Sequence, residues 1–288
     1  MRKRRTARLA GIAAGAAVAV GCFLVLTGCS AGSAPVAAPV NRSAPAGAAH
    51  PARVTRALAD RGGFAACEQR LESGPRSIPT VAIVGASYTA GAGPDNPALS
   101  WAAVLARRLR WNAVIYGVSG AGYIRPGADD LGPVRRLLAD ERLHGLAPSL
   151  VIIQAGHDDS GVPANAEEHQ VRRAIELIRA QSPHARIALL TVFTRPGHPV
   201  PASLVRIDKA IVSAGRAADP KVIIMDPLTG HWKYAREHGG LHPTAAGDAW
   251  IAGKVASILR AHGIDPRPRT AVTPVVCDRA VPAAMARA

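Results

Sequence analysis

Short apolar runs alternate with amphipathic segments along the middle of the chain, between about residues 78 and 264. Five of the runs are four to six residues long and rich in β-branched side chains, as buried parallel strands are. The expected strands are Val81–Val84, Ala113–Tyr116, Leu150–Gln154, Ile187–Val192 and Val222–Met225. Other segments place apolar residues at the 3.6-residue period of a helix. The expected helices are Trp101–Leu109, Val134–Leu143, Ala166–Arg179, Ser203–Ala217 and Ala245–Ala261.

This alternation predicts an α/β fold in which a five-stranded parallel sheet is flanked by helices on both faces. We expect a flavodoxin-like strand order with right-handed crossovers. In such open sheets, ligands bind in the crevice beyond the carboxyl ends of the strands. The informative loops are therefore those after the second, third and fifth strands, at residues 117–123, 155–159 and 226–242.

The stretch Thr80–Gly91 joins the first expected strand to a tight turn that carries Ser87. Its β-branched run ends in Gly85, and small residues surround the serine. Such a turn leaves the serine hydroxyl and nearby backbone N–H groups free to face a substrate, which makes Ser87 a candidate nucleophile. The alternative is a serine that only caps the following helix. Both interpretations fit this segment by itself.

The N-terminus has the organisation of a secretory signal. Residues 1–8 carry five basic residues and no acid, and an apolar run covers residues 9–26. Leu26-Thr27-Gly28-Cys29 resembles the lipobox of bacterial lipoproteins, in which the cysteine is acylated and becomes the mature N-terminus. We expect a signal peptide at 1–28 and lipidation of Cys29. The alternative is an uncleaved membrane anchor. Either arrangement places the rest of the chain outside the cytoplasm, anchored to the cell membrane or otherwise secreted.

Composition divides the remaining chain into four parts. Residues 29–52 are mostly Ala, Pro, Gly and Ser, and they cannot bury enough apolar surface to offset the entropy lost on ordering. We therefore expect a flexible tether there. A short N-terminal extension at 53–77 precedes a single domain at 78–264, which is long enough for a full hydrophobic core. The C-terminal tail at 265–288 resembles the tether in composition.

Net charge and aromatic content narrow the classes of partner. The formal charge of +15 falls to +10 without the signal, since 30 Lys and Arg then face 20 Asp and Glu. Only 4% of residues are aromatic and the arginines are spread over the expected helices, so no nucleic-acid partner is expected. A basic surface outside the cytoplasm favours anionic envelope polymers or lipid headgroups. We expect a monomer.

Two of the four cysteines, Cys22 and Cys29, lie in the signal and the lipobox. The other two, Cys67 and Cys277, flank the expected domain in an oxidising compartment, so we expect a disulfide between them. Two free, buried thiols are the alternative. No pair of Cys or His residues has the spacing of a zinc site, so we expect neither a metal nor another cofactor.

Four short blocks, each after an expected strand or before the last helix, make the chain resemble the SGNH hydrolases, or GDSL esterase superfamily, over about residues 78–262. The first block is Gly85-Ala86-Ser87, where the family has Gly-Asp-Ser, and the second is Val118-Ser119-Gly120. The third is Gly156-His157-Asp158-Asp159, where the family has Gly-x-Asn-Asp. The fourth is Gly239-Gly240-Leu241-His242-Pro243, where the family has Asp-x-x-His-Pro. This resemblance implies a three-layer flavodoxin-like fold. It also implies cleavage of esters through an acyl-enzyme.

The resemblance implies that Ser87 is the nucleophile and that Ser87, Gly120 and Asp158 stand at the oxyanion hole. The chemistry of a serine nucleophile independently requires a base, usually a neutral histidine, and the position of His242 before the last helix suits that role. Asp158, however, replaces the asparagine donor of the family. An ionised carboxylate cannot donate a hydrogen bond, and loss of one oxyanion donor typically costs about 10²–10³ in turnover.

The acceptor that would orient the His242 ring is left open by the sequence. Gly239 stands where the family has its third triad member. A backbone carbonyl, Asp226 and Glu237 are the alternatives in the same loop. Asp248, in the last helix, is expected on the helix surface.

Two classes of function are consistent with these residues. The first is an extracytoplasmic serine esterase or acyltransferase that acts on acyl esters of envelope glycans or lipids. Ser87, Gly120 and His242 favour it. The second is a non-catalytic SGNH-like domain that binds a glycan or lipid in the same cleft, which Asp158 and Gly239 favour.

Overall fold

The structure, a computed structural model of the 288-residue chain, describes residues 51–279 other than 75, 95, 129–130, 238–239 and 265–272. Side chains are described from residue 62 onward. The chain divides into two units, Met1–Ala48 and Ala49–Ala288, and every described residue belongs to the second. The expected signal peptide, Cys29 and nearly all of the expected tether therefore lie outside the described residues.

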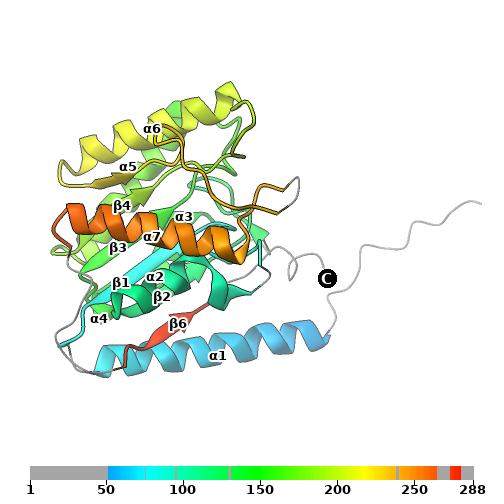
Figure 1. The fold of residues 1–288 in the computed structure, drawn as a ribbon. Coiled ribbons are helices and arrows are strands. Elements are labelled where there is room, and N and C mark those ends of the chain that lie inside the picture. The colour runs from blue at the N-terminus through cyan, green and yellow to red at the C-terminus, as the bar shows by residue number, and fades with distance from the viewer. Residues whose placement is uncertain are drawn as a thin grey trace, which may run out of the picture. The chain divides into compact units, whose positions relative to one another are not determined.

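A parallel sheet of six strands forms the middle layer, in the order β5-β4-β3-β1-β2-β6 (Figure 1). Its strands are β1 Thr80–Gly85, β2 Asn112–Gly117, β3 Leu150–Gln154, β4 Arg186–Leu190, β5 Ile223–Met225 and β6 Val276–Asp278. The α/β prediction and the flavodoxin-like order are confirmed. The predicted number of five strands is wrong, because β6 comes from the segment expected to be a tail.

Helices cover both faces of the sheet (Figure 1). They are α1 Pro51–Ser73, the 3₁₀ turn η1 Pro97–Leu99, α2 Trp101–Leu109, α3 Val134–Asp140, α4 Leu143–Leu146, α5 Ala164–Gln181, α6 Ala202–Ala218 and α7 Ala245–Ala261. The single helix expected over Val134–Leu143 is wrong. The chain breaks it at Arg142, whose φ of 44° is left-handed. None of the helices in the described part of the chain has the length and apolarity that a membrane span requires.

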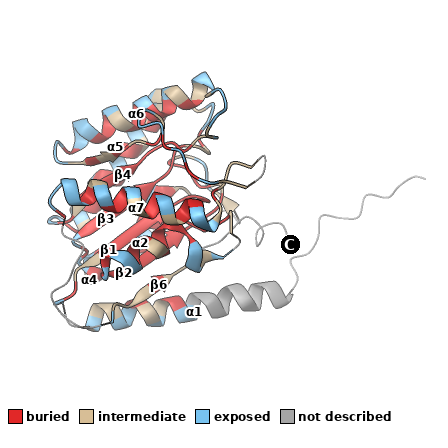
Figure 2. Cartoon of the chain, in the orientation of Figure 1, coloured by how far each residue is buried: buried red, intermediate tan, exposed pale blue. Residues whose placement is uncertain are grey.

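The core lies in two layers because successive strand residues point to opposite faces. In β1, Val81 and Ile83 pack with α2 and α7, whereas Ala82 and Val84 pack with the apolar faces of α3 to α6. Figure 2 shows β1 and β3 buried, β6 mostly at intermediate burial, and exposed residues on the outer faces of the helices. This two-sided burial explains why the strands read as continuous apolar runs rather than alternating ones.

The edge strand β6 is held against β2 by backbone hydrogen bonds and is bonded to α1 by a disulfide. Ala113 N donates to Val275 O at 2.9 Å, and Arg279 N donates to Ile115 O at 2.8 Å. Cys277, in β6, is bonded to Cys67, in α1, across 210 residues, which confirms the expected bridge. In the chain-entropy treatment, closing a loop of this length stabilises the fold by about 5 kcal/mol.

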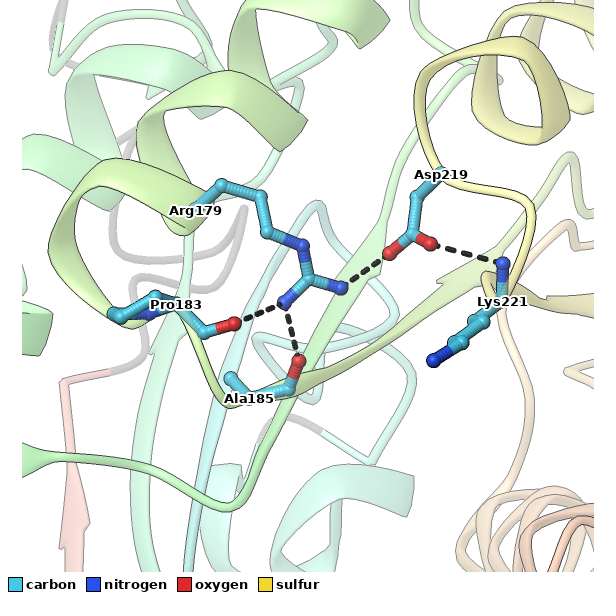
Figure 3. A network of polar contacts seen from close by, with 5 residues as sticks. All are labelled: Arg179, Pro183, Ala185, Asp219 and Lys221. Atoms are coloured by element: carbon cyan, nitrogen blue, oxygen red, sulfur yellow. Dashed lines mark hydrogen bonds and ion pairs between the residues drawn. The ribbon is translucent and has the colours of Figure 1, made fainter.

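At the amino end of β4, a polar network joins two turns (Figure 3). Arg179 donates to the carbonyls of Pro183 and Ala185, and it forms an ion pair with Asp219 at the end of α6. Burial acts to raise the pKa of the Asp219 carboxyl, but the hydrogen bonds from Arg179 and from Lys221 N outweigh it and lower that pKa. The turn between α5 and β4 is thereby fixed to the turn before β5, at the edge opposite the informative loops.

Candidate active site

Ser87 and His242 meet at the carboxyl edge of the sheet, although 155 residues separate them. Ser87 lies in the turn after β1, and His242 lies in the loop before α7. The distance from His242 Nε2 to Ser87 Oγ is 3.0 Å. A neutral imidazole protonated at Nδ1 accepts the serine proton in this arrangement, which is the geometry of a nucleophile and its general base. Only 8% of Ser87 is exposed, so the hydroxyl lies at the base of the site rather than on an open surface.

The turn that carries Ser87 is held by Gln154, the last residue of β3. The Gln154 side-chain oxygen accepts hydrogen bonds from Ala86 N at 3.2 Å and from Thr89 N at 3.3 Å. It also accepts one from the Thr89 hydroxyl at 2.9 Å. Gln154 is fully buried, and the Thr89 N–H and hydroxyl depend on its side-chain oxygen, whereas Ala86 N also donates to the Gln154 carbonyl at 3.0 Å. The sequence analysis assigned no role to Gln154, although a polar residue at the end of an apolar strand was a usable signal.

The approach of this turn to β3 also requires glycine at position 85. A Cβ built on Gly85 would lie 2.3 Å from the Thr89 hydroxyl oxygen and 2.8 Å from the Gln154 carbonyl oxygen. Real Cβ atoms do not approach so closely, and the second contact is with backbone that cannot easily move. The glycine of the first sequence block is therefore a packing requirement of the Ser87 turn.

Two backbone N–H groups are available beside the serine. Gly120 follows β2 in the left-handed region, at φ +78°, and the preceding Val118 N donates to Gly85 O at 2.8 Å. This bond places the loop after β2 next to the strand that carries Ser87. Among the described residues, the N–H groups of Ser87 and Gly120 donate no hydrogen bond. Free backbone donors of this kind are what an oxyanion hole requires.

The loop after Gly120 is fixed by Asp159, a residue to which the sequence analysis gave no role. Its carboxylate accepts hydrogen bonds from the N–H groups of Tyr123 at 2.6 Å, Arg125 at 3.0 Å and Ile124 at 3.3 Å. A Cβ on Gly122 would lie 2.1 Å from Asp159 Oδ2, so this close approach requires glycine there. Asp159 thereby joins the loop after β3 to the loop after β2.

A second buried acid accompanies Asp159. Burial, followed by the negative charge of Asp159, raises the pKa of Glu167 in α5 to about 9. Glu167 is therefore protonated at neutral pH. Burial raises the pKa of Asp159, and the three N–H donors partly oppose this rise. A neutral Glu167 beside Asp159 avoids a second buried charge. We therefore assign Asp159 and Glu167 to holding the loop after β2 in place and give them no part in the reaction.

Asp158 is half-buried and stands where the family resemblance places an asparagine donor. Burial raises the pKa of Asp158 and the charge of Asp159 adds to the effect, whereas His157 partly opposes both. A hydrogen bond from its own backbone N–H also acts to lower the pKa of the Asp158 carboxyl. A raised pKa moves the carboxyl towards its protonated form, in which it can donate a hydrogen bond.

Of the acceptors expected for the His242 ring, Asp226 has other partners. Its carboxylate accepts hydrogen bonds from Thr229 N and the Thr229 hydroxyl in the turn after β5. The main chain of Glu237 instead donates from N to His242 O at 3.1 Å, which fixes the backbone of the histidine. Gly239 lies outside the described residues.

Asp248 is fully buried, so the expectation that it lies on the surface of the last helix is wrong. Its Oδ1 accepts a hydrogen bond from Trp101 N, the first residue of α2, at 2.9 Å. Burial raises the pKa of Asp248 to about 8, and the Trp101 bond only partly opposes this effect. The signal was present in the sequence, because Asp248 shares its helical stripe with Ile251, Val255 and Leu259.

No cation site accompanies these groups. In the part of the chain that the structure describes, no cluster of three or more His, Cys, Asp or Glu side chains could hold a metal ion. The groups gathered at this edge are thus a hydroxyl, an imidazole, backbone N–H groups and a raised-pKa carboxyl, a set suited to acyl transfer.

Comparisons with known proteins identify the family and the fold. Residues 83–250 match the model of the GDSL-like lipase/acylhydrolase family. A family two carbohydrate esterase from Clostridium thermocellum in complex with cellohexaose is similar in structure, with a TM-score of 0.51, 17% identity and 67% of each chain covered. A carbohydrate esterase family 2 enzyme from Corynascus thermopiles (Myceliophthora fergusii) gives a TM-score of 0.54 at 20% identity, covering 66% of this chain and 68% of that one. The inhibitor-bound aryl esterase of M. smegmatis gives a TM-score of 0.50 at 16% identity, covering 64% of this chain and 99% of that one. Identities this low show a shared fold. A search of curated proteins finds no match.

Proposed function

The chain belongs to the GDSL-like lipase/acylhydrolase family, and on that premise we propose that it is an extracytoplasmic serine ester hydrolase or acyltransferase. Its proposed substrates are acyl esters of envelope glycans or lipids. The family and the esterase folds that resemble it support action on ester bonds. The single observation that carries the serine mechanism is the 3.0 Å contact between His242 Nε2 and Ser87 Oγ.

In the proposed reaction, Ser87 Oγ attacks the ester carbonyl carbon while His242 Nε2 takes the hydroxyl proton. The carbonyl oxygen becomes an oxyanion, which the N–H groups of Ser87 and Gly120 stabilise. As the intermediate collapses, the imidazolium returns the proton to the departing alkoxy oxygen, and the acyl group stays on Ser87. Water, or an acceptor hydroxyl in a transferase, then attacks the acyl-enzyme with His242 again as base.

The proposed location and substrate class rest on the N-terminal sequence and on the relatives. A basic leader, an apolar run and Cys29 in a lipobox-like sequence support export and lipid attachment, with the chain after Cys29 as a tether. The carbohydrate esterases among the similar structures support a glycan ester as substrate. Envelope acyl esters satisfy both arguments, because they lie within reach of a membrane-tethered enzyme.

One observation favours the second function, a non-catalytic binding domain. Asp158 replaces an oxyanion donor, and its negative charge, when ionised, repels a developing oxyanion. A weakened oxyanion hole leaves a cleft that can bind an ester without cleaving it. The raised pKa of Asp158 counts against this alternative, because a protonated carboxyl restores a donor.

A fluorophosphonate probe tests the proposal on the purified protein. We expect the wild type to be labelled at Ser87 and to hydrolyse p-nitrophenyl acetate and acetylated xylan, while Ser87→Ala and His242→Gln lose both properties by at least 10³-fold. Ser213→Ala, which changes an exposed serine in α6, is the matched control and should behave as wild type. A folded wild type that is neither labelled nor active, yet binds the glycan, would establish the binding domain instead.

A further inference from the structure

The backbone around His242 is held from both sides of its loop. Glu237 N donates to His242 O at 3.1 Å, and Thr244 N donates to Ala235 O at 3.0 Å. Arg236 and Pro243 form an antiparallel bridge within the same loop. These contacts fix the peptide that follows His242. The peptide that precedes it, with the carbonyl of Leu241, needs a separate partner, since a loop turn alone does not orient a side chain.

Tyr88, the residue after the proposed nucleophile, is that partner. Its hydroxyl donates to Leu241 O at 2.7 Å. Its ring meets the His242 ring edge-on, with centroids 5.6 Å apart and planes at 63°. The Tyr88 ring also stacks on Phe193, with centroids 4.2 Å apart and planes at 10°, and this contact restricts its orientation. Tyr88 is 2% exposed. One side chain therefore touches both the backbone and the ring of the region that carries the base.

Tyr234 completes this hydroxyl network from the loop after β5. Its hydroxyl lies 2.8 Å from the Tyr88 hydroxyl and 3.0 Å from Thr194 O. Two hydroxyl protons serve three contacts, and the carbonyl of Leu241 can only accept. The Tyr88 hydroxyl donates to Leu241 O and the Tyr234 hydroxyl donates to Thr194 O, while either hydroxyl can be the donor in the contact between them. Burial raises the pKa of both phenols, that of Tyr234 to about 12, so both remain donors at neutral pH.

We propose that Tyr88 is a positioning residue for His242. By holding the Leu241 carbonyl and the edge of the imidazole, it keeps Nε2 directed at Ser87 Oγ. The family resemblance places an acidic triad member at position 239, where this chain has a glycine without a side-chain acceptor. Tyr88 orients the histidine through its contacts with the Leu241 carbonyl and with the His242 ring. The effect of Tyr88 on kcat rests on the proposed function, whereas its effect on the orientation of the His242 ring does not.

The direct readout is the tautomer of the His242 imidazole, measured by ¹⁵N NMR on the full-length protein with and without Tyr88→Phe. In the proposed mechanism Nε2 accepts from Ser87 Oγ, 3.0 Å away, which requires the neutral ring to carry its proton on Nδ1. A free neutral histidine favours the proton on Nε2. We expect Tyr88→Phe, which keeps the ring and removes only the hydroxyl, to move the His242 signals towards the free tautomer.

The kinetic readout is the separation of kcat from KM on p-nitrophenyl acetate. We expect Tyr88→Phe to lower kcat about tenfold and to change KM by less than twofold, since the substrate is not contacted. Tyr234→Phe is the matched control. It removes a hydroxyl from the same network but leaves the bond from Tyr88 to Leu241, so its kcat should fall by less than threefold.

The outcomes separate the inference from the proposed function. If the wild type is neither active nor labelled, the proposed function fails, and the NMR tautomer alone decides the role of Tyr88. An unchanged tautomer and kcat in a folded Tyr88→Phe protein would overturn the inference. Equal losses of kcat and equal falls in Tm for both tyrosine variants would also overturn it, because they would indicate a general packing role.

Discussion

The side-chain oxygen of Gln154 accepts hydrogen bonds from both the N–H and the hydroxyl of Thr89, at 3.3 and 2.9 Å. These two residues are 65 positions apart, and their contact closes the turn that presents Ser87. A buried amide thus holds the turn of Ser87, the proposed nucleophile, where the neighbouring Ala86 has no polar side chain.

Replacing Gln154 by Leu should loosen this turn. The change leaves the N–H and the hydroxyl of Thr89 without their side-chain acceptor, whereas Ala86 N keeps the carbonyl of residue 154, and each unpaired buried group costs about 1–3 kcal/mol. We expect a fall in the free energy of unfolding of at least 2 kcal/mol and a slower reaction of Ser87 with fluorophosphonate, measured by denaturant titration and by labelling rate. Gln181→Leu, at the half-buried end of α5, is the control. Equal labelling rates in the wild type and in Gln154→Leu would contradict the assignment.

Asp158→Asn should improve the oxyanion hole. Asparagine donates at every pH, whereas the aspartic carboxyl donates only when protonated. We expect kcat on a small acetyl ester at pH 7–8 to rise about tenfold or more. Because burial raises the pKa of Asp158, the advantage of Asn over Asp should shrink as the pH falls. Asp140→Asn, on the exposed side of α3, should leave kcat unchanged. A lower kcat in folded Asp158→Asn would show that the carboxyl has a role of its own.

The bridge between Cys67 and Cys277 should contribute strongly to stability. Cys277→Ser removes the cross-link and weakens the attachment of β6 to β2, so we expect the free energy of unfolding to fall by about 2–5 kcal/mol. Thermal unfolding of oxidised wild type, reduced wild type and Cys277→Ser measures this loss. Reduced wild type and Cys277→Ser should agree closely. Free thiols at both positions in protein from an oxidising compartment would disprove the bridge.

The buried carboxyl of Asp248 should make stability depend on pH. Burial raises its folded-state pKa to about 8, above the ordinary value near 4 in the unfolded chain. Between these values the folded state holds a proton that the unfolded state has released. The protonated Asp248 therefore makes its full contribution to the free energy of unfolding below about pH 4. This contribution is lost as the pH rises to 8, and the free energy of unfolding falls by up to about 1.4 kcal/mol per pH unit.

Asp248→Asn removes this proton while keeping an oxygen acceptor for Trp101 N. Denaturant titrations at pH 5 to 8 should therefore give a shallower pH dependence for Asp248→Asn than for the wild type. Asp140→Asn again provides the exposed comparison and should retain the wild-type slope. Identical slopes in all three proteins would refute a buried, protonated Asp248.

Cys29 lies outside the described residues, and its lipidation stays a prediction from sequence. We expect mass spectrometry of the mature protein to find an acylated N-terminal cysteine at position 29. Cys29→Ala should accumulate as an unprocessed precursor that is not labelled by radioactive or clickable fatty acid. A wild-type N-terminus mapped to any other residue would exclude the lipoprotein assignment.

The sequence by itself determined the alternation of strands and helices and the positions of Ser87 and His242. These features depend on local periodicity and on short blocks, which a chain carries regardless of its long-range contacts. The same information misplaced one helix, because the break at Arg142 depends on backbone that turns left-handed between α3 and α4. It also missed β6, since three residues have too little pattern of their own and form a strand only by pairing with β2.

Only the tertiary structure decided what the polar residues around the site do. Asp159 becomes a clamp because folding brings the N–H of Tyr123, 36 residues earlier, to its carboxylate. Asp248 is buried because Trp101, 147 residues earlier, begins a helix against it. Tyr88 reaches Leu241 across 153 residues. A hydrogen bond needs two atoms within about 3 Å, and for partners so distant in sequence only the packing of the sheet and its helices determines which atoms meet.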